Sequence, residues 1–400
     1  MIALSLGLGL LAAILVLPTL SDLLSLIRVL ARRSTPHTPR AGAAPRILFL
    51  VPAHDEELLL PACLQSLRRL RYPSERRDIV VVADNCRDRT AEIACGAGVR
   101  CLERNVPADP GKPRAIAWAL AQLPVAEYDG VVIVDADTEV EPGFAASLAT
   151  AAPIAHKVLQ PYNGVSNETE NALTRMAAVL SAANHGLAYV LKTRAGLNVP
   201  LSVGMCIGTQ VLTTHGWTVH TVCEDWELYA LLTARGVSIE EIPAARIRAQ
   251  EAATLRASST QRRRWTAGKL VVLAEHAWPI VRSPHAALAQ KLDALAELTA
   301  PGPVLHLGLV GLAATVALLL HPPAFAWLAA LLLATLVRPA TYTLAALARD
   351  PAPVPAIRAF AFLPLYAIWR IGAAVSAFGT MRNATWIRTA RAIRPEQREQ

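Results

Sequence analysis

The sequence has 400 residues, which suffices for one domain of ordinary enzyme size with accessory segments and excludes several large domains. Hydrophobic residues make up 53% of the chain and charged residues only 18%, and the apolar excess lies at the two ends, which indicates a membrane protein with a soluble middle. The net charge of +8 suits nucleic acid, anionic lipid and phosphate-bearing substrates alike, so charge alone excludes none of them. The six cysteines contain no C-x-x-C pair and no zinc-site spacing, which predicts reduced and mostly buried thiols.

The first predicted element is a transmembrane helix over residues 1–30. No charged side chain precedes Asp22, and the apolar run is long enough to cross ~30 Å of hydrocarbon. A cleaved signal peptide is the alternative, but it requires a basic start and a small-residue cleavage site, and neither is clear. Arginines follow the apolar run into a basic linker at 31–45, so the positive-inside rule places the next domain in the cytoplasm.

The middle of the chain, residues 46–285, is predicted to form one α/β domain. Predicted strands alternate with predicted helices, the strands at 47–51, 79–83, 99–102 and 131–134 and the helices at 57–70, 89–97 and 113–123. This alternation is typical of a layered fold with a largely parallel sheet. Because ligands bind beyond the carboxyl ends of such strands, we search for chemistry in the polar segments that follow them.

Polar segments follow the first two predicted strands. The first strand leads into Pro52, Ala53, His54, Asp55 and Glu56, and the second leads into Asp84. Acidic groups at one edge of a sheet repel one another unless a positive charge joins them. Lys112 follows a glycine just before a predicted helix, where an ammonium group suits phosphate oxygens, although a lone lysine is more often a solvated one.

The strongest chemical signal is the pair Asp135 and Asp137, which follows a strand of four apolar residues. Alternation along an extended chain would point both carboxylates the same way. Mg²⁺ and Mn²⁺ prefer oxygen ligands, and one or two carboxylates plus substrate phosphates is a common arrangement. A surface turn after a strand is the alternative, since aspartate is frequent in turns.

Two further motifs lie near the end of this domain. Glu224 and Asp225 open a predicted helix, where an ionised carboxylate is favoured and can act as a general base, with an ordinary acidic N-cap as the alternative. Gln261, Arg264 and Trp265 share one helical face, on which a guanidinium group could bind a diphosphate and an indole could support a sugar ring. The alternative is a basic helix that rests on anionic lipid.

The remaining chain is predicted to return to the membrane. A linker or interface helix at 286–297 precedes an uncharged stretch that we interpret as a helical hairpin over 298–346, with its turn at His321, Pro322 and Pro323. The segment 358–380 is long enough to span, but Arg370 near its middle favours an amphipathic helix in the interface. The tail at 381–400 is basic and is predicted to stay in the cytoplasm.

Taken in order, these motifs resemble the family 2 inverting glycosyltransferases, the group that includes cellulose, chitin and hyaluronan synthases. The resemblance covers residues 46–269 and rests on D-x-D at Asp135 and Asp137, E-D at Glu224 and Asp225, and Q-x-x-R-W ending at Trp265. It implies a GT-A fold, which is a Rossmann-like mixed sheet, together with a nucleotide-sugar donor and a Mg²⁺ or Mn²⁺ ion. His54 and Asp55 stand where many members have an aromatic residue and asparagine, and the segment 204–210 lacks their arginine pair, so acceptor choice does not carry over.

The resemblance implies a role for each site residue. The catalytic base would be Asp225, the metal ligands Asp137 and Asp135, the donor-binding residues Pro52, Ala53, His54, Glu56, Asp84, Lys112 and Asp135, and the residues for the acceptor and diphosphate Glu224, Gln261, Arg264 and Trp265. The expected donor is a UDP-sugar and the expected acceptor a lipid or glycan at the cytoplasmic face of the cell membrane, with no nucleic-acid partner. A processive polysaccharide synthase is the nearest alternative. A nucleotidyltransferase and a non-catalytic membrane scaffold are the alternatives from other classes.

Overall fold

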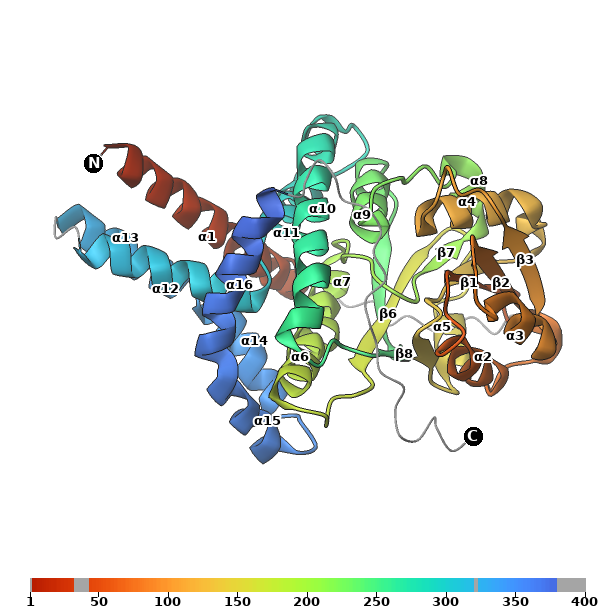
Figure 1. Cartoon of the computed structure of the whole chain (residues 1–400). Helices are drawn as coiled ribbons and strands as arrows, with labels where there is room; N and C mark the ends of the chain where they lie inside the picture. The colour runs from red at the N-terminus through yellow and green to blue at the C-terminus, as the bar shows by residue number, and fades with distance from the viewer. Residues whose placement is uncertain (1, 32–42, 320–322, 380–400) are drawn as a thin grey trace.

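The computed structural model describes residues 2–31, 43–319 and 323–379. Most of the predicted linker at 31–45, the turn residues His321 and Pro322, and the basic tail at 381–400 lie outside the described residues. Figure 1 shows a sheet domain at one end of the molecule and helices that project from the other end.

An eight-stranded sheet forms the centre of the α/β domain. Its order is β3-β2-β1-β4-β7-β6-β8-β5. The strands are β1 (Ile47–Ala53), β2 (Arg77–Asp84), β3 (Arg100–Arg104), β4 (Gly130–Ile133), β5 (Thr138–Val140), β6 (Val158–Val165), β7 (Cys206–Gly208) and β8 (Ile239–Ala249). The first four pair in parallel, β7 is antiparallel to both of its neighbours, and β5 is antiparallel to β8. All four predicted strands are confirmed, and the sheet is mixed because β7 and β5 run against the direction that the other strands share.

Helices cover both faces of this sheet. One face packs against α4 (Lys112–Gln122), α8 (Thr209–His215) and α9 (Glu224–Ala234), and the other packs against α2 (Leu60–Arg68), α3 (Thr90–Gly96) and α5 (Phe144–Ala149). In β1, Leu48 and Leu50 join the first core while Phe49 and Val51 join the second, and all four are fully buried. A strand covered on both faces is apolar at every position, which explains why β1 shows no alternation.

A second group of helices joins the sheet domain to the projecting ones. They are α6 (Ala172–Ala183), α7 (Tyr189–Ala195), α10 (Leu255–Arg282), α11 (Leu288–Thr299), α14 (Val337–Leu347), α15 (Pro353–Ala359) and α16 (Leu363–Phe378). Short single-turn elements lie at Ser74–Arg76, Val125–Glu127, Asn184–Ala188 and Phe360–Phe362. The long helix α10 contacts α9 of the sheet domain and also α16, so it connects the two parts of the molecule.

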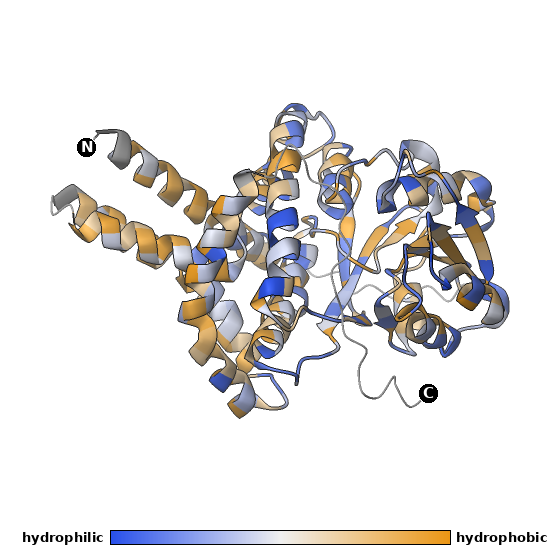
Figure 2. Ribbon diagram, viewed as in Figure 1, coloured by the Kyte–Doolittle hydropathy of each residue, from blue (hydrophilic) through white to orange (hydrophobic). Residues whose placement is uncertain are grey.

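The projecting helices are α1 (Ile2–Ala31), α12 (Pro303–Leu319) and α13 (Pro323–Ala334). They pack through a cluster that includes Leu15, Val310 and Leu332, and Figure 2 shows them as hydrophobic along most of their length. By length and composition, Ser5–Ala31, Phe325–Leu347 and Pro353–Ala377 could each cross a membrane, and α11 with α12 forms a further candidate that is bent by 75°. The described parts of the predicted hairpin form α12 and α13, and the hairpin itself stays a prediction.

A buried ion network joins the N-terminal helix to the sheet domain. Lys192 of α7 has no exposed side-chain surface and forms ion pairs with Asp293 and, at 3.0 Å, with Glu297, both on α11. Arg338 of α14 pairs with Asp22 of α1 at 2.7 Å and lies 4.0 Å from Glu297. Because a buried charge is tolerated only when it is paired, this network fixes four helices relative to one another.

We predict that Lys192→Ala lowers the free energy of unfolding by about 3–5 kcal/mol, because two buried carboxylates then lose their cation. Urea denaturation of the detergent-solubilised protein, followed by tryptophan fluorescence, measures the change. Arg248→Ala is the matched control, since Arg248 forms an exposed pair with Glu141 whose loss costs about 1 kcal/mol or less. Equal effects of the two substitutions would contradict the structural role of the network.

Candidate active site

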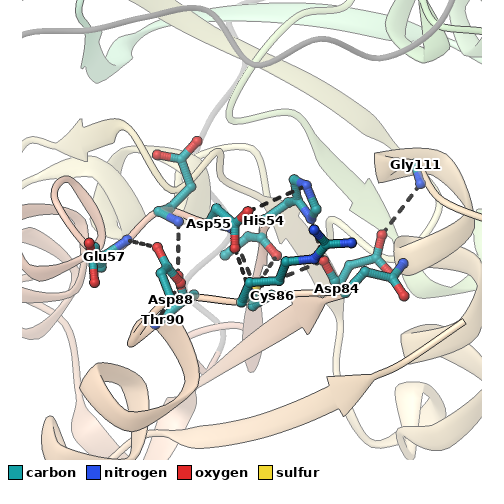
Figure 3. Close-up of polar contacts among 12 residues, drawn as sticks. His54, Asp55, Glu57, Asp84, Cys86, Asp88, Thr90 and Gly111 are labelled. Carbon is teal, nitrogen blue, oxygen red and sulfur yellow. Dashed lines mark hydrogen bonds and ion pairs between the residues drawn. The ribbon is translucent and has the colours of Figure 1, made fainter. Parts of the chain in front are cut away.

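Asp84 links the ends of the first three strands through its carboxylate and its backbone carbonyl. Arg104 at the end of β3 pairs with it at 2.7 Å, and the backbone N–H of Gly111 donates to its other oxygen at 3.4 Å. His54, just after β1, donates from Nδ1 to the Asp84 carbonyl oxygen at 2.6 Å (Figure 3). The two segments predicted to line a nucleoside pocket therefore lie together, and Gly111 joins them to the helix that begins at Lys112.

The turns after β1 and β2 are held in an unfavourable backbone conformation. Asp55 has φ of 54° and Asn85 has φ of 53°, in the left-handed region that few residues other than glycine adopt. Asp55 Oδ1 accepts a hydrogen bond from the Arg87 N–H at 2.7 Å, and Asn85 Oδ1 accepts one from the Val106 N–H at 2.7 Å. These side-chain hydrogen bonds offset the strain and fix the shape of the strand-end edge.

Hydrogen bonds also connect the turn after β1 to the turn after β2. Pro52 and Ala53 end β1 beside β2, and the next backbone N–H groups of Glu56 and Glu57 donate to Thr90 Oγ1 and to an Asp88 carboxylate oxygen. Figure 3 shows these contacts between the two turns. These N–H groups donate to side chains of the second turn. The helix α2 begins after them, at Leu60, three residues later than the predicted start.

Asp55, Cys86 and Asp88 lie close enough together to be considered as metal ligands, with their ligand atoms within 4.8 Å of one another. Asp55 and Asp88 already accept backbone hydrogen bonds from the two turns. Burial raises the pKa of the Cys86 thiol, which disfavours the thiolate that a metal requires. We therefore assign this group to turn stabilisation.

Lys112 forms ion pairs with two motifs that are distant in the sequence, the D-x-D motif and the E-D motif. Its Nζ lies 2.6 Å from Asp135 Oδ1 and 2.7 Å from Glu224 Oε1, and all three side chains are mostly buried. Burial alone would lower the Lys112 pKa, but the two carboxylates outweigh burial and hold the pKa above its usual range. The lysine is therefore a permanent cation between the D-x-D and E-D motifs.

Asp225 lies beside this cluster at the start of α9. Burial, followed by the negative charge of Glu224, raises its pKa to about 7, against the opposing effects of the Trp226 N–H and Lys112. The Trp226 N–H donates to Asp225 Oδ1 at 2.8 Å. A carboxylate that titrates near neutral pH is well matched to a general base, and an ordinary solvated N-cap would titrate far lower.

Asp135 and Asp137 lie in a turn between β4 and β5. The strand ends at Ile133, earlier than an extended D-x-D would require, because the Thr138 N–H donates to the Asp135 carbonyl oxygen at 3.0 Å and reverses the chain. Both carboxylates are partly exposed while Ala136 between them is buried. Two partly exposed carboxylates in one turn, one of them beside a cation, fit the oxygen ligand set that Mg²⁺ or Mn²⁺ prefers.

The helix α10 passes directly behind the start of α9. Cys223 Sγ lies 3.9 Å from the Arg264 carbonyl oxygen and 3.8 Å from that of Trp265. A Cβ atom on Gly268 would lie 2.3 Å from the same sulfur, so only glycine permits this approach. The packing places the Arg264 and Trp265 backbone next to the turn that carries Asp225.

The side chains of the Q-x-x-R-W motif differ in exposure. Trp265 is 38% exposed, and the guanidinium of Arg262 lies 4.8 Å from its ring centroid. Gln261 is 6% exposed, and no hydrogen bond joins it to the carboxylates among the residues that the structure describes. Lys269 Nζ lies 4.0 Å from the Trp226 ring centroid, and burial lowers the pKa of Lys269 to about 8.

Sequence reasoning missed four residues that shape the site. Arg104 pairs with Asp84, Cys223 and Gly268 make the contact between helices, and Lys269 stacks on Trp226. Arg104 lies two residues beyond the predicted strand at 99–102, so a search for charged residues just after predicted strands would have found it. The Cys223 and Gly268 contact joins residues far apart in the chain and leaves no local signal.

Comparison with known proteins identifies the family. The model of "Glycosyltransferase like family 2" matches residues 45–268. A probable glycosyltransferase of Bacillus subtilis, YdaM, is 26% identical over 245 residues, which cover 57% of this chain and 56% of that protein. A beta-monoglucosyldiacylglycerol synthase of Synechocystis is 26% identical over 235 residues, which cover 56% and 48%. The chain thus matches about half the length of these curated relatives.

A solved structure supports the same assignment at the level of the fold. The mannosyltransferase PcManGT from Pyrobaculum calidifontis, in complex with GDP-Man and Mn²⁺, aligns over 95% of this chain and 98% of its own, with a TM-score of 0.59 and 18% identity. This similarity confirms the predicted GT-A fold. Because the family model covers more than half of the 400 residues, the chain belongs to the family-2-like glycosyltransferases.

Proposed function

We propose that this chain is a metal-dependent, inverting glycosyltransferase that moves a sugar from a nucleoside-diphosphate sugar to a lipid or glycan acceptor at the cytoplasmic face of the cell membrane. The observation that carries the proposal is the cluster of Lys112, Asp135 and Glu224 beside Asp225. It combines a fixed cation for a diphosphate with a carboxylate that titrates near neutral pH. These are the two functions that a single-displacement transfer requires.

The proposed reaction is one displacement at the anomeric carbon. Asp225 accepts the proton of the acceptor hydroxyl, the acceptor oxygen forms the new bond to the anomeric carbon, and the bond from that carbon to the diphosphate oxygen breaks. Lys112 and Arg264 stabilise the negative charge that develops on the departing nucleoside diphosphate. No covalent sugar–enzyme intermediate is needed, so the configuration of the sugar is inverted.

Asp135 and Asp137 are the proposed metal ligands, with Asp137 as the firmer one. A bound Mg²⁺ or Mn²⁺ would supply charge neutralisation to the donor diphosphate. Pro52, Ala53, His54, Glu56 and Asp84 form the proposed nucleoside side of the donor site. Their position at the carboxyl ends of β1 and β2 supports this role.

A lipid or short-glycan acceptor fits better than a long polymer. The Synechocystis relative is named a glycolipid synthase. Within the described residues, two or three candidate spans follow the proposed catalytic domain, which is few for a polymer channel. A processive synthase remains the second candidate because the Q-x-x-R-W motif is present, and the length of the product on a gel separates the two.

The alternatives from other classes have less support. A nucleotidyltransferase would consume a nucleoside triphosphate and release pyrophosphate, and the match to a glycosyltransferase family speaks against it. A non-catalytic scaffold would use its acidic residues as strand and helix caps. The raised pKa of Asp225 is hard to reconcile with a cap, because a solvated cap carboxylate keeps a low pKa.

One experiment tests the proposal as a whole. Membranes that contain the protein are incubated with a panel of nucleotide sugars and with Mn²⁺ or Mg²⁺, and release of nucleoside diphosphate is measured. We expect release from at least one donor, with UDP-sugars first, and its loss on chelation of the metal. Release of pyrophosphate from a nucleoside triphosphate, or no release from any donor, would refute the proposal.

We predict that kcat/KM rises with pH through an apparent pKa near 7, because only the ionised Asp225 can accept the acceptor proton. Between roughly pH 8 and pH 5.5 the ionised fraction falls about thirtyfold, and kcat/KM falls with it. Initial rates at several low acceptor concentrations measure the profile. A rate that stays constant down to pH 5.5 would exclude Asp225 as the base.

We predict that Asp137→Asn lowers kcat by ~10²–10³-fold, because the donor diphosphate loses part of its charge stabilisation. The same variant should lose Mn²⁺-dependent binding of the nucleoside diphosphate, which calorimetry detects without turnover. Glu141→Gln is the matched control, since Glu141 follows β5 and pairs with Arg248. Near-normal transfer by purified Asp137→Asn would overturn the metal assignment.

A further inference from the structure

The helix α16 has two chemically different faces. Leu365, Ile368 and Val375 recur at helical spacing and are 59%, 69% and 65% exposed. Tyr366 and Arg370 lie on the opposite face, four residues apart, and both are buried. The exposed face is suited to lipid, whereas the buried face carries a charge.

The buried face of α16 packs against α10. Arg262 of α10 lies near Tyr366 of α16 and forms an ion pair with Glu251. The Tyr366 ring is also stacked on Trp369, with centroids 5.4 Å apart. Figure 1 shows α16 running alongside α10. The helix that carries the Q-x-x-R-W motif is therefore in direct contact with α16.

Arg370 lies at the contact between α10 and α16, which we call the seam, and no carboxylate of the described residues neutralises its charge. It is 9% exposed, and its Nη1 atom is buried without a hydrogen-bond partner. Arg262 lies close enough to repel it, and Glu251 already neutralises Arg262. No carboxylate pairs with Arg370 in the part of the chain that the structure describes. A buried guanidinium without a counter-ion is costly, so this position favours an anion from outside the chain.

The placement of α16 decides what kind of anion can reach Arg370. The segment Pro353–Ala377, which includes α16, is long and apolar enough to span a membrane, but α16 packs along α10, which carries Arg262, Arg263 and Arg264 and is not among the candidate spans. This packing favours a position of Arg370 at the level of lipid headgroups over one in the hydrocarbon core. An exposed apolar face with a cationic inner face is typical of a helix in the membrane interface.

We infer that the seam between α10 and α16 binds the phosphate group of an anionic lipid through Arg370, with Tyr366 and Trp265 beside it. Arginine binds phosphate oxygens through two parallel N–H donors, and the Nη1 group of Arg370 is buried without a hydrogen-bond partner. Arg262 also lies 4.8 Å from the Trp265 ring centroid, and the Trp265 backbone contacts the turn of Asp225, so Arg262 connects the seam to the proposed acceptor side. This inference rests on the proposed function only where it identifies the lipid as an acceptor.

Thermal unfolding tests lipid binding without turnover. The full chain, purified in neutral detergent, is mixed with phosphatidylglycerol or with phosphatidylcholine, and Tm is followed by tryptophan fluorescence. We expect phosphatidylglycerol at a hundredfold excess over its Kd to raise Tm by roughly 4 °C, and phosphatidylcholine to have a smaller effect.

Substitution of Arg370 separates a ligand site from a structural arginine. Arg370→Met should lose the response to phosphatidylglycerol while its Tm in neutral detergent equals or exceeds that of the unsubstituted protein, because a buried unpaired charge is removed. Arg370→Gln is a second neutral variant with the same expected loss. Arg358→Met on α15 is the matched control, since Arg358 is exposed, and it should retain the response. A lowered Tm with an unchanged lipid response, or no preference for phosphatidylglycerol, would overturn the inference.

A labelled nucleotide sugar then distinguishes the two sources of the phosphate. Sugar on the added anionic lipid identifies the occupant as the acceptor. A lipid that raises Tm but receives no sugar is a bilayer lipid that positions the enzyme. Both outcomes support the site, and the Tm response stands even if the donor panel refutes the proposed function.

Discussion

The arrangement of this site depends on one constraint, the mutual repulsion of carboxylates gathered at the edge of a sheet. Asp135, Glu224 and Asp225 come from two elements about ninety residues apart, and their charges would separate them without a cation. Lys112 provides that cation at 2.6 Å and 2.7 Å from two of them. No cation of the described residues forms an ion pair with Asp225, and burial, followed by the negative charge of Glu224, raises its pKa to about 7.

The position of Lys112 is itself determined by the fold. It opens α4, and the Gly111 before it adopts φ of 129°, a conformation that a side chain would disfavour. The Gly111 N–H is bound by Asp84, which Arg104 holds in turn. A change at the nucleoside side of the site would therefore reach the carboxylate cluster through three consecutive contacts.

Sequence patterns predicted the elements of the site well and their contacts poorly. The four strands, the start of α9 and the Q-x-x-R-W helix followed from local apolar runs and helical spacing, and the order of the motifs identified the family. The turn at Asp135 was predicted as extended chain, because its closing hydrogen bond to Thr138 depends on β5 pairing with β8. The ion pairs of Lys192 connect residues a hundred positions apart, so no local pattern reveals them.

Two buried cations near the apolar helices differ in whether a carboxylate of the described residues pairs with them. Lys192 is enclosed by Asp293 and Glu297, so its charge is balanced within the chain and serves to join helices. Arg370 is buried to a similar degree, yet Glu251 pairs with Arg262 instead of with it. If Arg370 were structural, the fold would carry an uncompensated charge that leucine or methionine at the same position would avoid. A buried charge that no carboxylate of the described residues neutralises is best explained by a ligand that neutralises it.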